Sequence, residues 1–234
     1  CRIWDNADAL GRQFSSGDIV KIKAYSLNYR GALQLNISAI ERITDSSTSL
    51  QDFLPASPFS PEDTFRELMH YVQLIENPHL KMFIETLFSD PDTVKGFKEA
   101  PAAKSIHHDY LGGLLDHTFT VTRIAYDLSS YYPHVDRDIL VTGAIIHDIG
   151  KIYELSYERS FEYSDAGRLI GHITLGVEII NRTIEKITGF PEDLALVIKH
   201  LMLSHHGQYD FGSPKRPKTL EAMLLSYIDD IDAK

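Results

Sequence analysis

The sequence predicts a mainly α-helical protein with a short β segment near its N-terminus. From residue 61 onward, apolar residues recur at helical spacing between capping and helix-breaking residues, whereas before residue 45 they alternate with polar ones. The chain has 234 residues, of which 43% are hydrophobic. This is enough for one large domain or two small ones, each with its own core. The 24% of charged and 10% of aromatic residues exclude a disordered or fibrous chain.

The N-terminal segment predicts a β-hairpin. In residues 18–25, aliphatic side chains alternate with Lys21, Lys23 and Tyr25, so these three would share one strand face. The turn signal Asn-Tyr-Arg-Gly then leads to a second alternating stretch over residues 33–38. So short a β segment is too small for an independent domain, and we expect it to be part of a larger β module.

A linker rich in Ser, Thr and Pro follows over residues 44–61. It predicts two parts, a β segment with linker at 1–52 and a helical domain at 53–234. Ser60 followed by Pro61 is a strong helix start. We expect a short hairpin within residues 153–163. The helices are predicted near 61–75, 77–89, 92–99, 108–131, 136–149, 166–188, 191–205 and 217–232.

Charge and cysteine content narrow the classes of protein. The net charge is −10, with +1 in residues 1–50 and −11 in the rest, which argues against coating nucleic acid by bulk charge. The negative charge is still compatible with phosphate binding through metal ions, which bring their own positive charge. The single cysteine, Cys1, excludes a disulfide framework and fits a reducing cytoplasm. We expect no membrane span and no secretory leader, and we expect the chain to be a piece of a longer protein.

The pair His147-Asp148 is the first candidate site. It follows an apolar helix that we expect to end at Gly150. Two polar groups at the end of a buried helix need partners, and one metal ion can satisfy both. A nitrogen and a carboxylate together suit Mn, Fe, Ni or Zn.

Further ligand-type residues lie on other apolar helices: His117, His172, His205, His206, Asp229, Asp230 and Asp232. Three of the candidate histidines have a glycine four residues away, on the same helix face: Gly113, Gly143 and Gly176. A missing side chain there would let helices approach around a compact cluster. Ordinary helix packing at glycines is the alternative.

Four motifs support a family resemblance: HHDYLGGLLDH at 107–117, GAIIHDIGK at 143–151, GHITLG at 171–176 and SHHGQYDFGSP at 204–214. With them the sequence resembles the HD-domain superfamily of metal-dependent phosphohydrolases. More narrowly, it resembles the YhaM-type 3′–5′ exoribonucleases, which place an OB-fold before the HD domain. The resemblance is clear over 105–234, the expected core of the HD helical bundle. It is weaker over 1–42, where only part of an OB-fold would fit.

The resemblance implies two metal sites. One ion would be bound by His117, His147, Asp148 and Asp229. Asp148 would bridge to a second ion bound by His172 and His205. His206 and Asp232 stay open, Asp232 with a solvated helix end as the alternative. Lys151 would touch the phosphate, or else face the dipole at the end of the preceding helix.

Six nitrogen and oxygen ligands without a thiolate describe a catalytic dinuclear site rather than a structural zinc site. We expect two divalent ions, Mn first, with Fe, Ni, Co, Mg or Zn as alternatives. The sequence has no GxxxxGK[ST] loop for a nucleotide-driven motor and no GxSxG nucleophile elbow.

The β segment indicates the substrate. Lys21, Lys23 and Tyr25 on one face, with Tyr29 and Arg30 in the next turn, offer phosphate neutralisation and base stacking for single-stranded nucleic acid. A half-exposed structural strand is the alternative. His107 or His108 would line a substrate channel, or lie on an ordinary surface.

Together these features predict a 3′–5′ exonuclease that acts on single-stranded RNA, with DNA as a second substrate. Three alternatives stay open: a hydrolase of a small nucleotide or cyclic dinucleotide, a nucleic-acid-binding module without turnover, and a di-iron oxygenase. A homo-oligomer is also left open.

Overall fold

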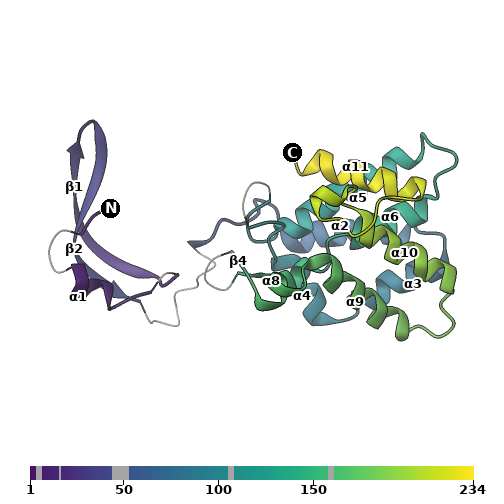
Figure 1. Cartoon of the computed structure of the whole chain (residues 1–234), viewed down its shortest axis with the longest axis horizontal. Coiled ribbons are helices and arrows are strands. Elements are labelled where there is room, and N and C mark those ends of the chain that lie inside the picture. Colours follow the sequence, from purple (N-terminus) through teal and green to yellow (C-terminus); the bar gives the residue numbers. More distant parts are fainter. Residues whose placement is uncertain (4–6, 16, 44–52, 105–107, 158–160) are drawn as a thin grey trace. The chain divides into compact units, whose positions relative to one another are not determined.

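The computed structural model describes residues 1–3, 7–15, 17–43, 53–104, 108–157 and 161–234 (Figure 1). The chain divides into two compact units. One is Cys1–Leu54, and the other combines Pro55–Tyr157 with Phe161–Lys234. The second unit is helical and the first contains a two-stranded sheet, so the prediction of a mainly α protein with an N-terminal β segment is confirmed.

The first unit contains the short helix α1 (Ala7–Gly11) and an antiparallel hairpin of β1 (Val20–Tyr29) and β2 (Ala32–Arg42). The turn between the strands places Arg30 and Gly31 at positive φ, 53° and 82°. Such a pair of left-handed residues matches the right-handed twist of a hairpin. The predicted hairpin is therefore confirmed. Its membership of an OB-fold stays a prediction.

In the second unit, three consecutive helices begin in the same way. Ser60, Asn77 and Asp90 each accept a hydrogen bond from a backbone N–H of the first turn, and a proline follows each of them directly. A capping side chain and a proline with preset φ are the usual helix start. The helices are α2 (Pro61–Gln73), α3 (Pro78–Leu87), α4 (Pro91–Glu99), α5 (Gly113–Ser129), α6 (Arg137–Ile146), α7 (Lys151–Glu154), α8 (Asp165–Leu169), α9 (His172–Glu185), α10 (Glu192–Ser204) and α11 (Leu220–Asp232).

Two predicted helices were wrong in part. The stretch 108–131 becomes helical only at Gly113, because Gly112 has a left-handed backbone with φ of 82°. The stretch 166–188 is divided into α8 and α9 by Gly171, which has φ of 79°. The predicted short hairpin within 153–163 is confirmed by β3 (Leu155–Ser156) and β4 (Glu162–Tyr163), which pair with each other.

The core lies around α5 and α6, which pack against each other and against α11 (Figure 1). Glycines permit close helix approach here, as the sequence predicts. A Cβ at Gly143 would lie 2.8 Å from Leu201 Cδ1, and one at Gly176 would collide with Met202. The missing side chains let α10 pack closely against α6, which ends just before His147, and against α9, which begins at His172. Among the described helices, none is long and apolar enough to cross a membrane.

Candidate metal centre

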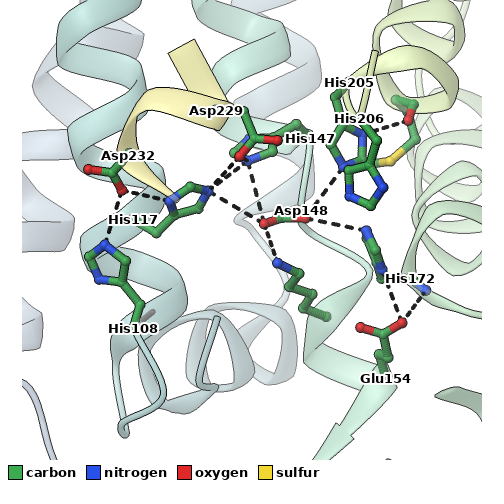
Figure 2. Close-up of polar contacts among 12 residues, drawn as sticks. His108, His117, His147, Asp148, Glu154, His172, His205, His206, Asp229 and Asp232 are labelled. Carbon is green, nitrogen blue, oxygen red and sulfur yellow. Dashed lines mark hydrogen bonds and ion pairs between the residues drawn. The ribbon is translucent and has the colours of Figure 1, made fainter. Parts of the chain in front are cut away.

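Five helices bring the predicted ligand residues to one place (Figure 2). His117 lies on α5, and His147 and Asp148 follow the last residue of α6. His172 begins α9, His205 caps α10, and Asp229 lies in the last turn of α11. Residues separated by more than a hundred positions therefore meet in one buried cluster.

Asp148 occupies the middle of this cluster and is 2% exposed. Its Oδ2 lies 3.6 Å from His117 Nε2 and 3.5 Å from His147 Nε2. Its Oδ1 lies 3.5 Å from His172 Nε2 and 3.6 Å from His205 Nε2. Each oxygen of one carboxylate thus faces its own pair of imidazoles (Figure 2).

The first group of atoms also includes Asp229. Its Oδ1 is 3.2 Å from His117 Nε2 and 3.6 Å from His147 Nε2. The two histidine Nε2 atoms are only 3.0 Å apart. Two imidazole lone pairs at that distance repel each other unless a proton or a cation lies between them. Two nitrogens and two carboxylate oxygens make a suitable ligand set for a divalent metal.

The second group contains buried polar atoms that lack a hydrogen-bond partner within the described part of the chain. They are Asp148 Oδ1, His172 Nε2 and His205 Nε2. Burying such atoms without a partner is costly, and a metal ion would satisfy all three. His206 lies in the same group, and its Nδ1–H donates to the Phe211 carbonyl (2.9 Å). The residues present therefore fit a second divalent ion.

Hydrogen bonds fix the imidazoles so that Nε2 points into the cluster. Nδ1 of His147 lies 2.8 Å from the Ala144 carbonyl, and Nδ1 of His205 lies 2.8 Å from the Met202 carbonyl. Because a carbonyl only accepts, each Nδ1 carries the proton and each Nε2 presents its lone pair.

Carboxylates orient the other two histidines. Glu154 Oε1 lies 3.0 Å from His172 Nδ1 and accepts the His172 backbone N–H at 2.9 Å. Asp232 Oδ2 lies 2.7 Å from His117 Nδ1. Sequence reasoning missed Glu154, and Asp232 is not the solvated helix end considered there. The signal for Glu154 was weak: a carboxylate in an alternating segment just after the His-Asp pair.

Electrostatics keep the two central carboxylates ionised. Burial by itself would raise the pKa of Asp148, but the Lys151 ammonium and the nearby His147 hold it well below its usual range. The pKa of Asp229 is lowered as well, because its interactions with His117 and His147 outweigh the effect of burial. Burial would lower the pKa of His117, yet hydrogen bonds to the carboxylates raise it to about 9. Asp148 and Asp229 are thus anionic and can serve as metal ligands.

Lys151 lies beside Asp148, and Gly150 differs from the expectation. Lys151 begins α7, and its Nζ donates to Asp148 Oδ2 at 2.6 Å. Gly150 has an ordinary helical φ of −65°, so it is not a left-handed helix stop. A glycine is needed there because a Cβ would collide with the His172 carbonyl oxygen. It lets α7 approach the start of α9, where the second group of ligand atoms lies.

The cluster opens into a cavity of about 720 Å³. Asp148, Lys151 and the second group of histidines line it. The lining also includes two further cationic side chains, Lys104 and Arg216, and aromatic ones, among them Phe211 and Tyr227. Cations and aromatic rings beside a metal centre suit a phosphate ester that bears a base.

The five predicted nucleic-acid-binding residues lie on the hairpin of the first unit, and all are exposed. Tyr25 is 61% and Tyr29 50% exposed. The Tyr25 hydroxyl accepts from Asn36 Nδ2 at 3.3 Å, and the Arg30 guanidinium lies 5.3 Å from the centre of the Tyr29 ring. Lys21 and Lys23 share the strand face of Tyr25. His107 lies outside the described residues.

A helical unit with buried histidines and aspartates is typical of proteins in which a helical scaffold holds divalent metal. A family model for the HD domain matches residues 114–234, just over half of the chain, so the chain belongs to the HD-domain family. Family membership and the His/Asp cluster together indicate a metal-dependent phosphohydrolase. No solved structure matches the chain.

Proposed function

We propose that this protein is a dinuclear metal-dependent phosphodiesterase that removes nucleotides from the 3′ end of single-stranded RNA. The observation that supports it most strongly is the position of Asp148. One buried carboxylate directs its two oxygens to two separate sets of histidines, at 3.5–3.6 Å. This is the arrangement needed for a ligand shared by two neighbouring ions.

In this proposal the first ion is held by His117, His147, Asp148 and Asp229, and the second by Asp148, His172 and His205, with His206 as a further candidate. Bound divalent ions would supply a hydroxide nucleophile and stabilise the charge of the phosphate oxygens. Mn is the expected metal, with Fe, Ni, Co, Mg or Zn as alternatives. Glu154 and the backbone carbonyls keep the imidazoles aligned.

Lys151 is proposed to contact the phosphate. Its ammonium lies beside Asp148 and lines the cavity, with its side chain 13% exposed. When cations occupy the ligand sets, they neutralise Asp148 in place of the Lys151 ammonium. Lys151 is then available to stabilise the negative charge that develops on a phosphate in the transition state.

The hairpin favours nucleic acid over a small nucleotide. The hairpin exposes two lysines, an arginine and two tyrosines, which suit backbone contacts and base stacking. The cavity beside the cluster adds Arg216 and Tyr227 to the surfaces available for a nucleotide. The preference for RNA and the 3′-to-5′ direction rest on the resemblance to YhaM-type enzymes.

The test uses the whole chain with single-stranded RNA and DNA labelled at either end, with Mn²⁺ or with chelator. RNA labelled at the 5′ end should shorten step by step, and RNA labelled at the 3′ end should release labelled mononucleotide at once. The shortening of the RNA and the release of mononucleotide should both disappear with chelator and in Asp148→Asn. The variant Asp210→Asn, which changes an exposed carboxylate, serves as the matched control.

Other outcomes would favour the alternatives. Hydrolysis of cyclic dinucleotides or mononucleotides, with intact RNA, would indicate a small-nucleotide hydrolase. Tight RNA binding by metal-loaded protein, without any cleavage, would indicate a binding module.

A further inference from the structure

A chain of polar contacts leads from His117 away from the metal centre. His117 Nδ1 lies 2.7 Å from Asp232 Oδ2, and the same oxygen lies 3.0 Å from His108 Nε2 (Figure 2). Both imidazoles therefore meet one carboxylate oxygen in the last turn of α11. The Asp232 side chain is only 14% exposed, so these contacts are largely shielded from water.

The contacts continue on the far side of His108. Its Nδ1 lies 2.9 Å from the Tyr110 hydroxyl. That hydroxyl lies 3.1 Å from Asp116 Oδ2, and the same oxygen accepts the Ser57 hydroxyl at 2.6 Å. A continuous network thus joins the segment before α2, the start of α5 and the end of α11 to His117.

The backbone at His108 is held in an unusual conformation. Its φ is 47°, which few residues other than glycine adopt and which is costly unless the surroundings impose it. The Ala102 N–H donates to the His108 carbonyl at 3.0 Å. A Cβ at Gly113 would collide with the same carbonyl oxygen, so the glycine is needed for this close approach. The fold thereby fixes the direction of the His108 imidazole.

We propose that His108 is a positioning residue for the metal centre. By holding Asp232 from the side opposite to His117, it fixes the carboxylate that keeps the proton of His117 on Nδ1 and directs Nε2 to the first ion. This inference rests on the proposed metal site. Its consequence is that His108 sets the affinity of the His117-containing site, and not that of the site formed by His172 and His205.

A metal ion bound directly by His108, His117 and Asp232 is the competing explanation, since their ligand atoms also lie within 4.8 Å of one another. The separations of 2.7 and 3.0 Å between nitrogen and oxygen are ordinary hydrogen-bond distances, so these contacts are explained without an ion. Such an ion would also take Nδ1 of His117 while Nε2 serves the central cluster.

The test replaces His108 with asparagine, which tolerates the left-handed backbone and removes the imidazole. A second variant, Tyr110→Phe, deletes one hydroxyl of the network. His134→Asn is the matched control, because His134 is exposed between α5 and α6. Each variant is made in the whole chain, alone and with His172→Ala, which leaves the His117-containing site to be measured by itself.

Metal affinity is measured by competition titration with Mn²⁺ and Co²⁺, beside total metal content and the melting temperature of the metal-free protein. His108→Asn should weaken the His117-containing site by roughly ten- to a hundred-fold, as is usual for partners that orient ligands. Tyr110→Phe should weaken it less. The other site and the control variant should keep wild-type affinity.

Four results would overturn the proposal. Unchanged affinity in His108→Asn, or equal weakening of both sites with a lower melting temperature, would reduce His108 to a structural residue. Loss of a complete further metal equivalent, with the two central sites intact, would make it a ligand. A wild-type chain that binds no divalent metal would refute the proposed function as well, so the two failures can be told apart.

Discussion

Replacing Asp148 with asparagine should remove the metal centre while the shape of the side chain is kept. Asp148 is 2% exposed and its Oδ2 accepts from Lys151 Nζ at 2.6 Å. The amide brings no charge, and one of its two terminal atoms becomes an NH₂ group that repels both the ammonium and a cation. We therefore expect both ions to be lost from Asp148→Asn.

The stability of the metal-free protein should also fall, because the variant leaves the Lys151 ammonium without its partner. Removing one member of a buried ion pair costs about 3–5 kcal/mol. The Lys151 side chain keeps 13% exposure, so we take the lower value. For a domain of this size about 3 kcal/mol corresponds to a decrease in melting temperature of about 6–12 °C.

A double variant separates the two effects. Asp148→Asn with Lys151→Met removes the unpaired charge, so the melting temperature should recover most of the loss while metal binding stays absent. The assay combines metal analysis by mass spectrometry with thermal unfolding of metal-free and metal-loaded protein. Full metal occupancy in a folded Asp148→Asn protein would refute the assignment of Asp148 as the shared ligand.

The other predictions concern the second ion, the phosphate contact and the hairpin. His172→Ala should lower the metal content by about one ion and leave the first site occupied, and retention of both ions in a folded protein would contradict this partition. Lys151→Ala should keep both ions but lower kcat/KM by roughly ten- to a thousand-fold, whereas normal turnover would mark a structural lysine. Replacing Lys21, Lys23 and Tyr25 with alanine should weaken binding of long single strands. The slope of log K against log salt concentration should become shallower by about 0.7 per lost phosphate contact. Hydrolysis of bis-p-nitrophenyl phosphate should stay nearly unchanged, and equal loss on both substrates would make the segment structural.

Much of the fold could be predicted because the signals are local. The capping residues Ser60, Asn77 and Asp90 stand directly before prolines, and α2, α3 and α4 begin there. The two errors come from backbone conformations at Gly112 and Gly171, which both have positive φ. The local sequence does not distinguish these two glycines from a glycine inside a helix, such as Gly143. Tertiary packing therefore decides which glycines interrupt a helix.

The candidate site shows the same division between local and tertiary signals. His117, His147 and His172 could be selected because polar side chains on apolar helices need partners, and the structure brings them to Asp148. Glu154 could not, because its hydrogen bond to His172 depends on how α7 meets α9. Gly150 could be selected, but for the wrong reason. The sequence suggests a helix stop, and the need for a glycine comes from the His172 carbonyl across the interface.

The central claim is that one carboxylate, Asp148, joins two divalent ions in one centre. Electron paramagnetic resonance of the whole chain, loaded with two equivalents of Mn²⁺, tests it most directly. Two ions that share a carboxylate should give the broad, closely split spectrum of an exchange-coupled pair, and Asp148→Asn should abolish it. A wild-type spectrum that contains only the sextet of isolated Mn²⁺ would contradict the account.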